Sequence, residues 1–215
     1  MQDRGRLCVA AVTAVLLAGC AAQTAQPKPW DLYNRSIATA ALSDEAHALK
    51  PINAEQAEVT VVRVQDHATV TTDRYVWVAL PEELRPFCKG NANPRLALQM
   101  ALGLKPEDED LKVFTLKVRP ADLFRPCATS PDITSTACKK VLPGALSVEA
   151  GHAQFMAMQM ASSYRPNGYP FTAMGWSYNW NPAAASPRGV SEYVVRPGAV
   201  LGFESVMPPA AFCAM

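Results

Sequence analysis

The sequence contains none of the short motifs that mark the common catalytic and nucleotide-binding sites. It has no G-x-S-x-G, no phosphate-binding P-loop, no H-E-x-x-H, no G-x-G-x-x-G and no EF-hand calcium loop. These absences argue against the enzyme, nucleotide-binding and calcium-binding families that the motifs define. They leave open an enzyme whose catalytic side chains lie far apart in the sequence.

Histidine is scarce, and closely spaced metal ligands are absent. The sequence holds no C-x-x-C and no H-x-x-x-H, so we expect no metal ion, and nothing indicates a cofactor. Asp66 precedes His67, but neighbours on a strand point to opposite faces, so we do not expect a catalytic relay there. His67 is typical of a solvated turn and His152 of a polar surface near a helix start. The acidic run from Glu107 to Asp110 lacks the spacing of a calcium loop, which favours a solvated loop.

Positive and negative side chains are nearly balanced in this chain. Beyond its first twenty residues, the sequence has no long apolar run. Lysine and arginine number 20, and aspartate and glutamate number 19. Phosphate binding needs a concentration of basic side chains, and there is no basic stripe, so nucleic acid is not an expected partner. The length suits one domain with a short leader.

The first twenty residues have the layout of an export signal. Arg4 and Arg6 form a basic start, an eleven-residue apolar run follows from Leu7 to Leu17, and small residues precede Cys20. The apolar run is too short for a permanent membrane span, which needs about 20 residues. We therefore interpret residues 1–19 as a signal peptide.

The stretch Leu17-Ala18-Gly19-Cys20 resembles the bacterial lipobox. The resemblance implies cleavage before Cys20 and attachment of fatty acyl chains such as palmitate, because several chains on one residue anchor a protein durably. An ordinary signal peptide with a cysteine at its cleavage region is the alternative. Residue 21 is alanine and not aspartate, which by analogy favours an outer-membrane lipoprotein that faces the periplasm. Residues 20–29 then form a lipidated tether and residues 30–215 a single domain.

Four further cysteines indicate two disulfides in an exported chain. Four cysteines allow three connectivities. The loop between Cys127 and Cys138 is short, polar and bent at Pro131, so we predict that these two pair and that Cys88 pairs with Cys213. A zinc site formed by the same cysteines is the alternative.

Alternating and Val/Thr-rich stretches predict a mainly antiparallel sheet. We expect strands over residues 58–65, 69–80, 111–118, 174–180, 190–196 and 199–206. Helices are expected over residues 93–103, where Asn93 and Pro94 suit a helix start, and over residues 147–164. A short helix is also expected over residues 43–50. Strands and helices do not alternate, so the sequence predicts an α+β fold with two or three helices, stapled by disulfides.

Aromatic residues gather in the segment from Tyr169 to Trp180. In an extended chain Trp176, Tyr178 and Trp180 share one face, and with Tyr169 they are candidates for stacking on a sugar ring or a peptide. The same row of rings is also typical of a sheet face buried under a helix. Both interpretations stay open at the level of sequence.

Segments between residues 75 and 196, such as YVWVALPEELRPFC and YPFTAMGWSYNW, resemble an uncharacterised group of proteobacterial lipoproteins. The resemblance implies one coherent domain and no particular activity. We therefore expect a non-enzymatic envelope lipoprotein that binds an envelope protein or glycan. The alternatives are a structural or assembly lipoprotein, and a hydrolase of cell-wall or lipid substrates that uses His67 or His152.

Overall fold

The computed structural model describes residues 27–106, 110–140 and 148–215. The predicted signal peptide over residues 1–19, Cys20, most of the predicted tether and the acidic residues 107–109 lie outside this part. Within the described residues no helix is long and apolar enough to cross a membrane.

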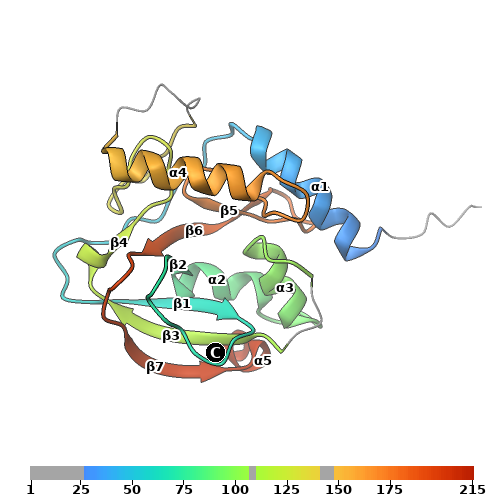
Figure 1. Cartoon of the computed structure of the whole chain (residues 1–215). Coiled ribbons are helices and arrows are strands. Elements are labelled where there is room, and N and C mark those ends of the chain that lie inside the picture. The colour runs from blue at the N-terminus through green and yellow to red at the C-terminus, as the bar shows by residue number, and fades with distance from the viewer. Residues whose placement is uncertain (1–26, 107–109, 141–147) are drawn as a thin grey trace, which may run out of the picture.

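A single antiparallel sheet organises the described residues (Figure 1). Its strand order is β4-β6-β2-β1-β3-β7, and β5 pairs separately with β6. The strands are β1 (Val59–Gln65), β2 (Val76–Ala79), β3 (Lys112–Val118), β4 (Leu123–Phe124), β5 (Trp176–Tyr178), β6 (Arg188–Val195) and β7 (Gly202–Met207). Every pairing is antiparallel, so the predicted α+β fold with a mainly antiparallel sheet is confirmed.

Five α-helices occur in the described residues, which is more than the two or three predicted. They are α1 (Pro29–Leu42), α2 (Pro81–Cys88), α3 (Pro94–Ala101), α4 (Ala150–Ser163) and α5 (Pro209–Ala214). The predicted start of α3 is confirmed, since the Asn93 side chain accepts a hydrogen bond from the Leu96 amide. The helices α2 and α5, which were not predicted, have only eight and six residues, and Pro86 lies inside α2, where proline disfavours a helix.

The short helix expected over residues 43–50 is wrong. Helix α1 ends at Leu42, and residues 43–50 have no regular secondary structure. Its end is held by tertiary contacts: the Leu49 amide donates to Thr136 O, and the Lys50 amide donates to Ser191 Oγ. These contacts, which sequence does not reveal, override the local helical preference of this alanine-containing segment.

Two groups of helices cover different parts of the sheet (Figure 1). Helices α2, α3 and α5 pack on apolar residues of β1, β3 and β6, including Val62, Val113 and Val190. Helix α4 packs on Val194 of β6 and Phe124 of β4. Figure 1 places α1 at the same end of the molecule as α4, beyond β5 and β6.

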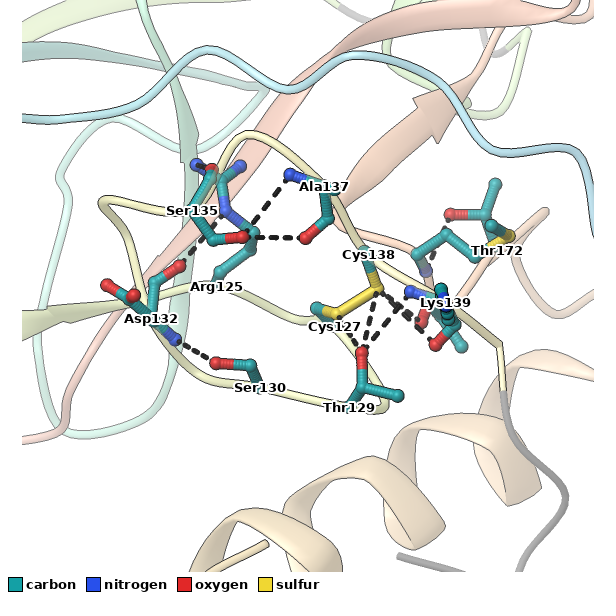
Figure 2. Close-up of a disulfide and its surroundings, with 12 residues drawn as sticks. Arg125, Cys127, Thr129, Ser130, Asp132, Ser135, Ala137, Cys138, Lys139 and Thr172 are labelled. Carbon is teal, nitrogen blue, oxygen red and sulfur yellow. Dashed lines mark hydrogen bonds between the residues drawn. A yellow bond between two sulfur atoms is a disulfide. The ribbon is translucent and has the colours of Figure 1, made fainter. Parts of the chain in front are cut away.

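Both predicted disulfides are confirmed. Cys88 at the end of α2 is bonded to Cys213 in α5, and Cys127 is bonded to Cys138. Figure 2 shows the second bridge closing a polar loop, with Thr129 facing its sulfur atoms; Thr129 Oγ1 lies 3.2 Å from Cys127 Sγ. The first bridge joins segments 125 residues apart and ties the end of the chain to the helical layer.

Candidate functional site

The aromatic segment does not form one exposed platform. Trp176 is fully buried, packs on Leu49 and the Cys127–Cys138 bridge, and meets the His47 ring edge-to-face at 4.7 Å. The interpretation of this residue as part of a packed core is therefore correct, and Trp176 cannot stack on an external ligand.

Trp180 is anchored as well. Its indole Nε1 donates to Leu104 O at 3.0 Å, and its ring meets Tyr33 of α1 edge-to-face at 6.1 Å. The Tyr33 hydroxyl in turn donates to Gly168 O at 2.7 Å. These contacts attach α1 to the end of the sheet and leave only the rim of Trp180 accessible.

A groove separates α1 from the loop that follows β5, and we call it the α1 groove. It has a volume of about 340 Å³, within the range of small-ligand sites. From α1 it is lined by Leu32, Arg35, Ser36 and Thr39, and from the β5–β6 segment by Tyr178, Asn179, Trp180, Asn181, Pro182, Ala184, Ser186 and Pro187. Two of the predicted candidates, Tyr178 and Trp180, thus line one cavity.

The groove offers amide, hydroxyl and guanidinium groups over an aromatic floor. Arg35 is its only charged lining residue, and it is exposed, with Nε donating to Asp31 O at 3.1 Å. Asn179 accepts from the Asn181 amide through Oδ1, and its side-chain nitrogen has no partner among the described residues. Burial raises the pKa of the Tyr178 hydroxyl, and a hydrogen bond with Thr39 partly offsets the rise. This lining suits a neutral or anionic polar ligand rather than a cation.

Tyr169, the remaining aromatic candidate, lies outside the α1 groove. It is half exposed, and the Lys105 ammonium lies 5.2 Å from its ring centre. The predicted group of four aromatic candidates is therefore divided between the core, the groove and a separate surface.

The histidines lie away from the groove. His67 is exposed, as predicted for a turn residue. Its Nδ1 lies 3.3 Å from Asp66 Oδ1, because the two residues lie in a turn and not on a strand. The argument from opposite strand faces therefore does not apply to this pair. His152 was expected on the surface but is buried, where it contacts Cys127 O at 2.7 Å through Nε2 and packs against Phe124. It connects α4 to the disulfide loop and has no access to a substrate.

A second, smaller cavity opens where β1 and β2 diverge, and we call it the Glu192 cleft. These strands share one register pair, Val62 with Ala79, and separate beyond it. The cleft has a volume of about 40 Å³ and is lined by Val62, Arg63, Val64, Trp77, Val78, Ala79, Leu102, Leu104 and Glu192. Burial raises the pKa of the Glu192 carboxyl to about 8, and its Oε2 is enclosed without a hydrogen-bond partner.

Sequence reasoning missed Arg35 and Glu192. No sequence pattern identifies Arg35 as a site residue, because its role depends on the placement of α1 beside the aromatic segment. A pattern does identify Glu192. It lies two residues from both Val190 and Val194, and alternate strand residues share a face. An acid between two apolar residues on a buried face indicates a carboxyl with restricted access to water.

In the described part of the chain no group of three or more histidine, cysteine or acidic residues is placed to hold a metal ion. Comparison with protein-family models, curated protein sequences and solved structures finds no match to this chain. The α1 groove and the Glu192 cleft are therefore the candidate binding sites in the described part of the chain.

Proposed function

We propose that this protein is a non-enzymatic binding module of the bacterial cell envelope, anchored through lipid on Cys20, which binds a polar envelope glycan in the α1 groove. The lipobox-like stretch supports the anchor and the envelope location, with the outer membrane and its periplasmic face favoured by Ala21. The observation that carries the binding role is the groove itself, where an arginine, side-chain amides, hydroxyl groups and aromatic edges converge.

The composition of the groove favours a glycan. Sugars present many hydroxyl groups, which amide and guanidinium groups bind with directed hydrogen bonds, while their apolar ring faces pack on aromatic side chains. The groove contains no histidine and no carboxylate among its lining residues. Glycoside hydrolysis commonly uses a pair of carboxylic acids, so the lining supports binding rather than cleavage.

Soluble muropeptides released from purified peptidoglycan provide the probe, and isothermal titration calorimetry on the full-length protein in detergent provides the measurement. We expect saturable binding by the wild type and about tenfold weaker binding by Arg35→Ala, since a charged hydrogen bond is lost. Arg165→Ala is the matched control, because Arg165 is also exposed and its Nε also donates to a main-chain oxygen, Ser162 O, at 3.1 Å.

The proposal predicts that the Arg165 variant binds like the wild type. Absence of saturable wild-type binding would contradict a glycan ligand. Equal affinities of all three proteins would show that the α1 groove is not the site.

A further inference from the structure

Asn179 places a fixed and unused hydrogen-bond donor in the α1 groove. The residue is only 5 % exposed. Its main-chain amide donates to Pro187 O at 2.7 Å, and its Oδ1 accepts from the Asn181 amide at 3.1 Å. Because a main-chain N–H can only donate, the side-chain atom that it meets is the oxygen, and Nδ2 is the atom left over. This Nδ2 has no partner among the described residues and is not enclosed by protein, so it faces the groove that Asn179 lines.

The other polar side chains of the groove also offer donors. Asn181 repeats the arrangement on the same wall, since its Oδ1 accepts at 3.0 Å from the main-chain amide two residues later. On the opposite wall Arg35 uses only Nε within the described residues, which leaves Nη1 and Nη2 for a ligand. Ser36 and Thr39 donate their hydroxyl hydrogens to main-chain oxygens of α1 itself. The strong donors left for a ligand are therefore side-chain N–H groups, and one of these groups is cationic.

We propose, on the premise that the α1 groove binds a glycan, that it selects a sugar bearing a carboxylate, which accepts hydrogen bonds from Asn179 Nδ2 and from the Arg35 guanidinium. A carboxylate only accepts, and its two oxygens have room for about four hydrogen bonds. Hydrogen bonds to an ionised acceptor are roughly twice as strong as those between neutral groups. Asn179 is already held by its neighbours in the free protein, so its immobilisation costs little when the ligand binds.

Other ligands fit the groove less well. The hydroxyl groups of a neutral sugar need acceptors as well as donors, and the Oδ1 atoms of Asn179 and Asn181 are already used by main-chain amides. A ligand with an ammonium group would meet these N–H groups and the positive charge of Arg35. A phosphate brings a charge of about −1.5 to −2 at pH 7, whereas Arg35 is the only charged residue of the lining.

The test compares N-acetylmuramic acid with two neutral relatives, its methyl ester and N-acetylglucosamine, which has the same ring without the lactyl carboxylate. Lactate supplies a carboxylate without a sugar ring, and N-acetylglucosamine 6-phosphate supplies a phosphate in its place. Isothermal titration calorimetry on the full-length protein in detergent gives the affinities. We expect N-acetylmuramic acid to bind about tenfold or more tightly than either neutral sugar, since both lack the charged acceptor.

Two variants locate the carboxylate. Asn179→Asp keeps the shape of the side chain and its Oδ1 but replaces the Nδ2 donor by a negatively charged oxygen, so the preference for the acid over its ester should disappear. Asn53→Asp is the matched control, because Asn53 Oδ1 also accepts from the main-chain amide two residues later, at 3.0 Å, and Asn53 lies outside the groove. Arg35→Gln changes an exposed residue of α1, so it tests the proposal even if the buried Asn179 variant does not fold. We expect it to reduce the preference about tenfold.

The outcomes separate this proposal from the proposed function. Equal affinities for the acid and its ester, or tighter binding of the phosphate, would overturn the carboxylate preference and leave glycan binding in place. Undetectable binding of N-acetylmuramic acid beside saturable binding of muropeptides would do the same. Lactate that binds as tightly as N-acetylmuramic acid would overturn both, because the sugar ring would contribute nothing. A preference for the acid that survives both Asn179→Asp and Arg35→Gln would place the carboxylate elsewhere and overturn the proposal.

Discussion

At the scale of single residues, Arg125 and Glu192 are two ionisable side chains in the interior that differ in the hydrogen-bond partners around them. The Arg125 guanidinium is fully buried, yet it donates to the carbonyl oxygens of Lys50, Asp132, Ile133 and Ser135 and lies 4.7 Å from the Tyr193 ring centre. Figure 2 shows this arginine inside the disulfide loop. Its charge is thus dispersed over main-chain dipoles, and it organises the loop. Glu192 has no comparable donors, so its burial favours the neutral form.

Glu192 makes a specific prediction about stability and pH. Burial raises the pKa of this carboxyl from 4.5 to about 8, so the folded state binds the proton more tightly than the unfolded chain. The resulting stabilisation is complete below about pH 4.5 and is lost as the pH rises through 8. One proton is involved, so the slope cannot exceed about 1.4 kcal/mol per pH unit.

Urea unfolding of the wild type and Glu192→Gln at pH 5, 7 and 9 tests this prediction. We expect the free energy of unfolding of the variant, minus that of the wild type, to increase as the pH rises. Glutamine cannot ionise, and the remaining titratable groups are common to both proteins and cancel in the difference. A difference that stays constant across this range would show that the carboxyl titrates normally.

At the scale of secondary-structure elements, α5 depends on a covalent bond. It has six residues, too few for a stable isolated helix, and Cys213 bonds it to Cys88 in α2. In the entropic model, this bridge across 125 residues stabilises the fold by about 5 kcal/mol, and the bridge across 11 residues between Cys127 and Cys138 by about 3 kcal/mol.

Replacing both cysteines of each bridge by alanine separates the two contributions. We expect the Cys88→Ala, Cys213→Ala variant to lose more stability in urea unfolding than the Cys127→Ala, Cys138→Ala variant. We also expect faster amide hydrogen exchange in α5 for the first variant only, because only that bridge fixes the helix. Exchange in α5 that is unchanged by the loss of Cys88–Cys213 would show that packing of Phe212 alone holds it in place.

Elements with a strong local pattern were predictable from the sequence, and elements set by tertiary contacts were not. Strand β3 carries the apolar residues Phe114, Leu116 and Val118 at alternate positions, all of them buried, and α3 begins at an asparagine cap, so both were predicted within a few residues. By contrast, only residues 76–79 of the strand expected over 69–80 pair in the sheet. One wall of the α1 groove was predictable, because the concentration of aromatic residues between Tyr169 and Trp180 indicated Tyr178 and Trp180. The other wall is helix α1, which was not predicted from the sequence.

At the scale of the whole molecule, the short stretch of chain between Cys20 and α1 limits how far the α1 groove can lie from the proposed anchor. Helix α1 is both one wall of the α1 groove and the first described element after Cys20. Nine residue steps separate Cys20 from Pro29, and a fully extended chain covers at most about 3.6 Å per residue, which gives a reach of roughly 30 Å. A lipid anchor at Cys20 would therefore hold the groove close to the membrane surface, where the ligand must also be accessible.

The anchor itself can be tested directly by Cys20→Ala. We expect the wild type, expressed in bacterial cells, to incorporate a clickable palmitate analogue and to fractionate with membranes. The variant should lose the label, because it lacks the side chain to which the acyl chains would be attached. Cys8→Ala is the matched control, since Cys8 lies inside the apolar run and should be discarded with it. Equal labelling of the wild type and Cys20→Ala would mean that the segment is an ordinary signal peptide, and the groove would then not be held at a membrane by this residue.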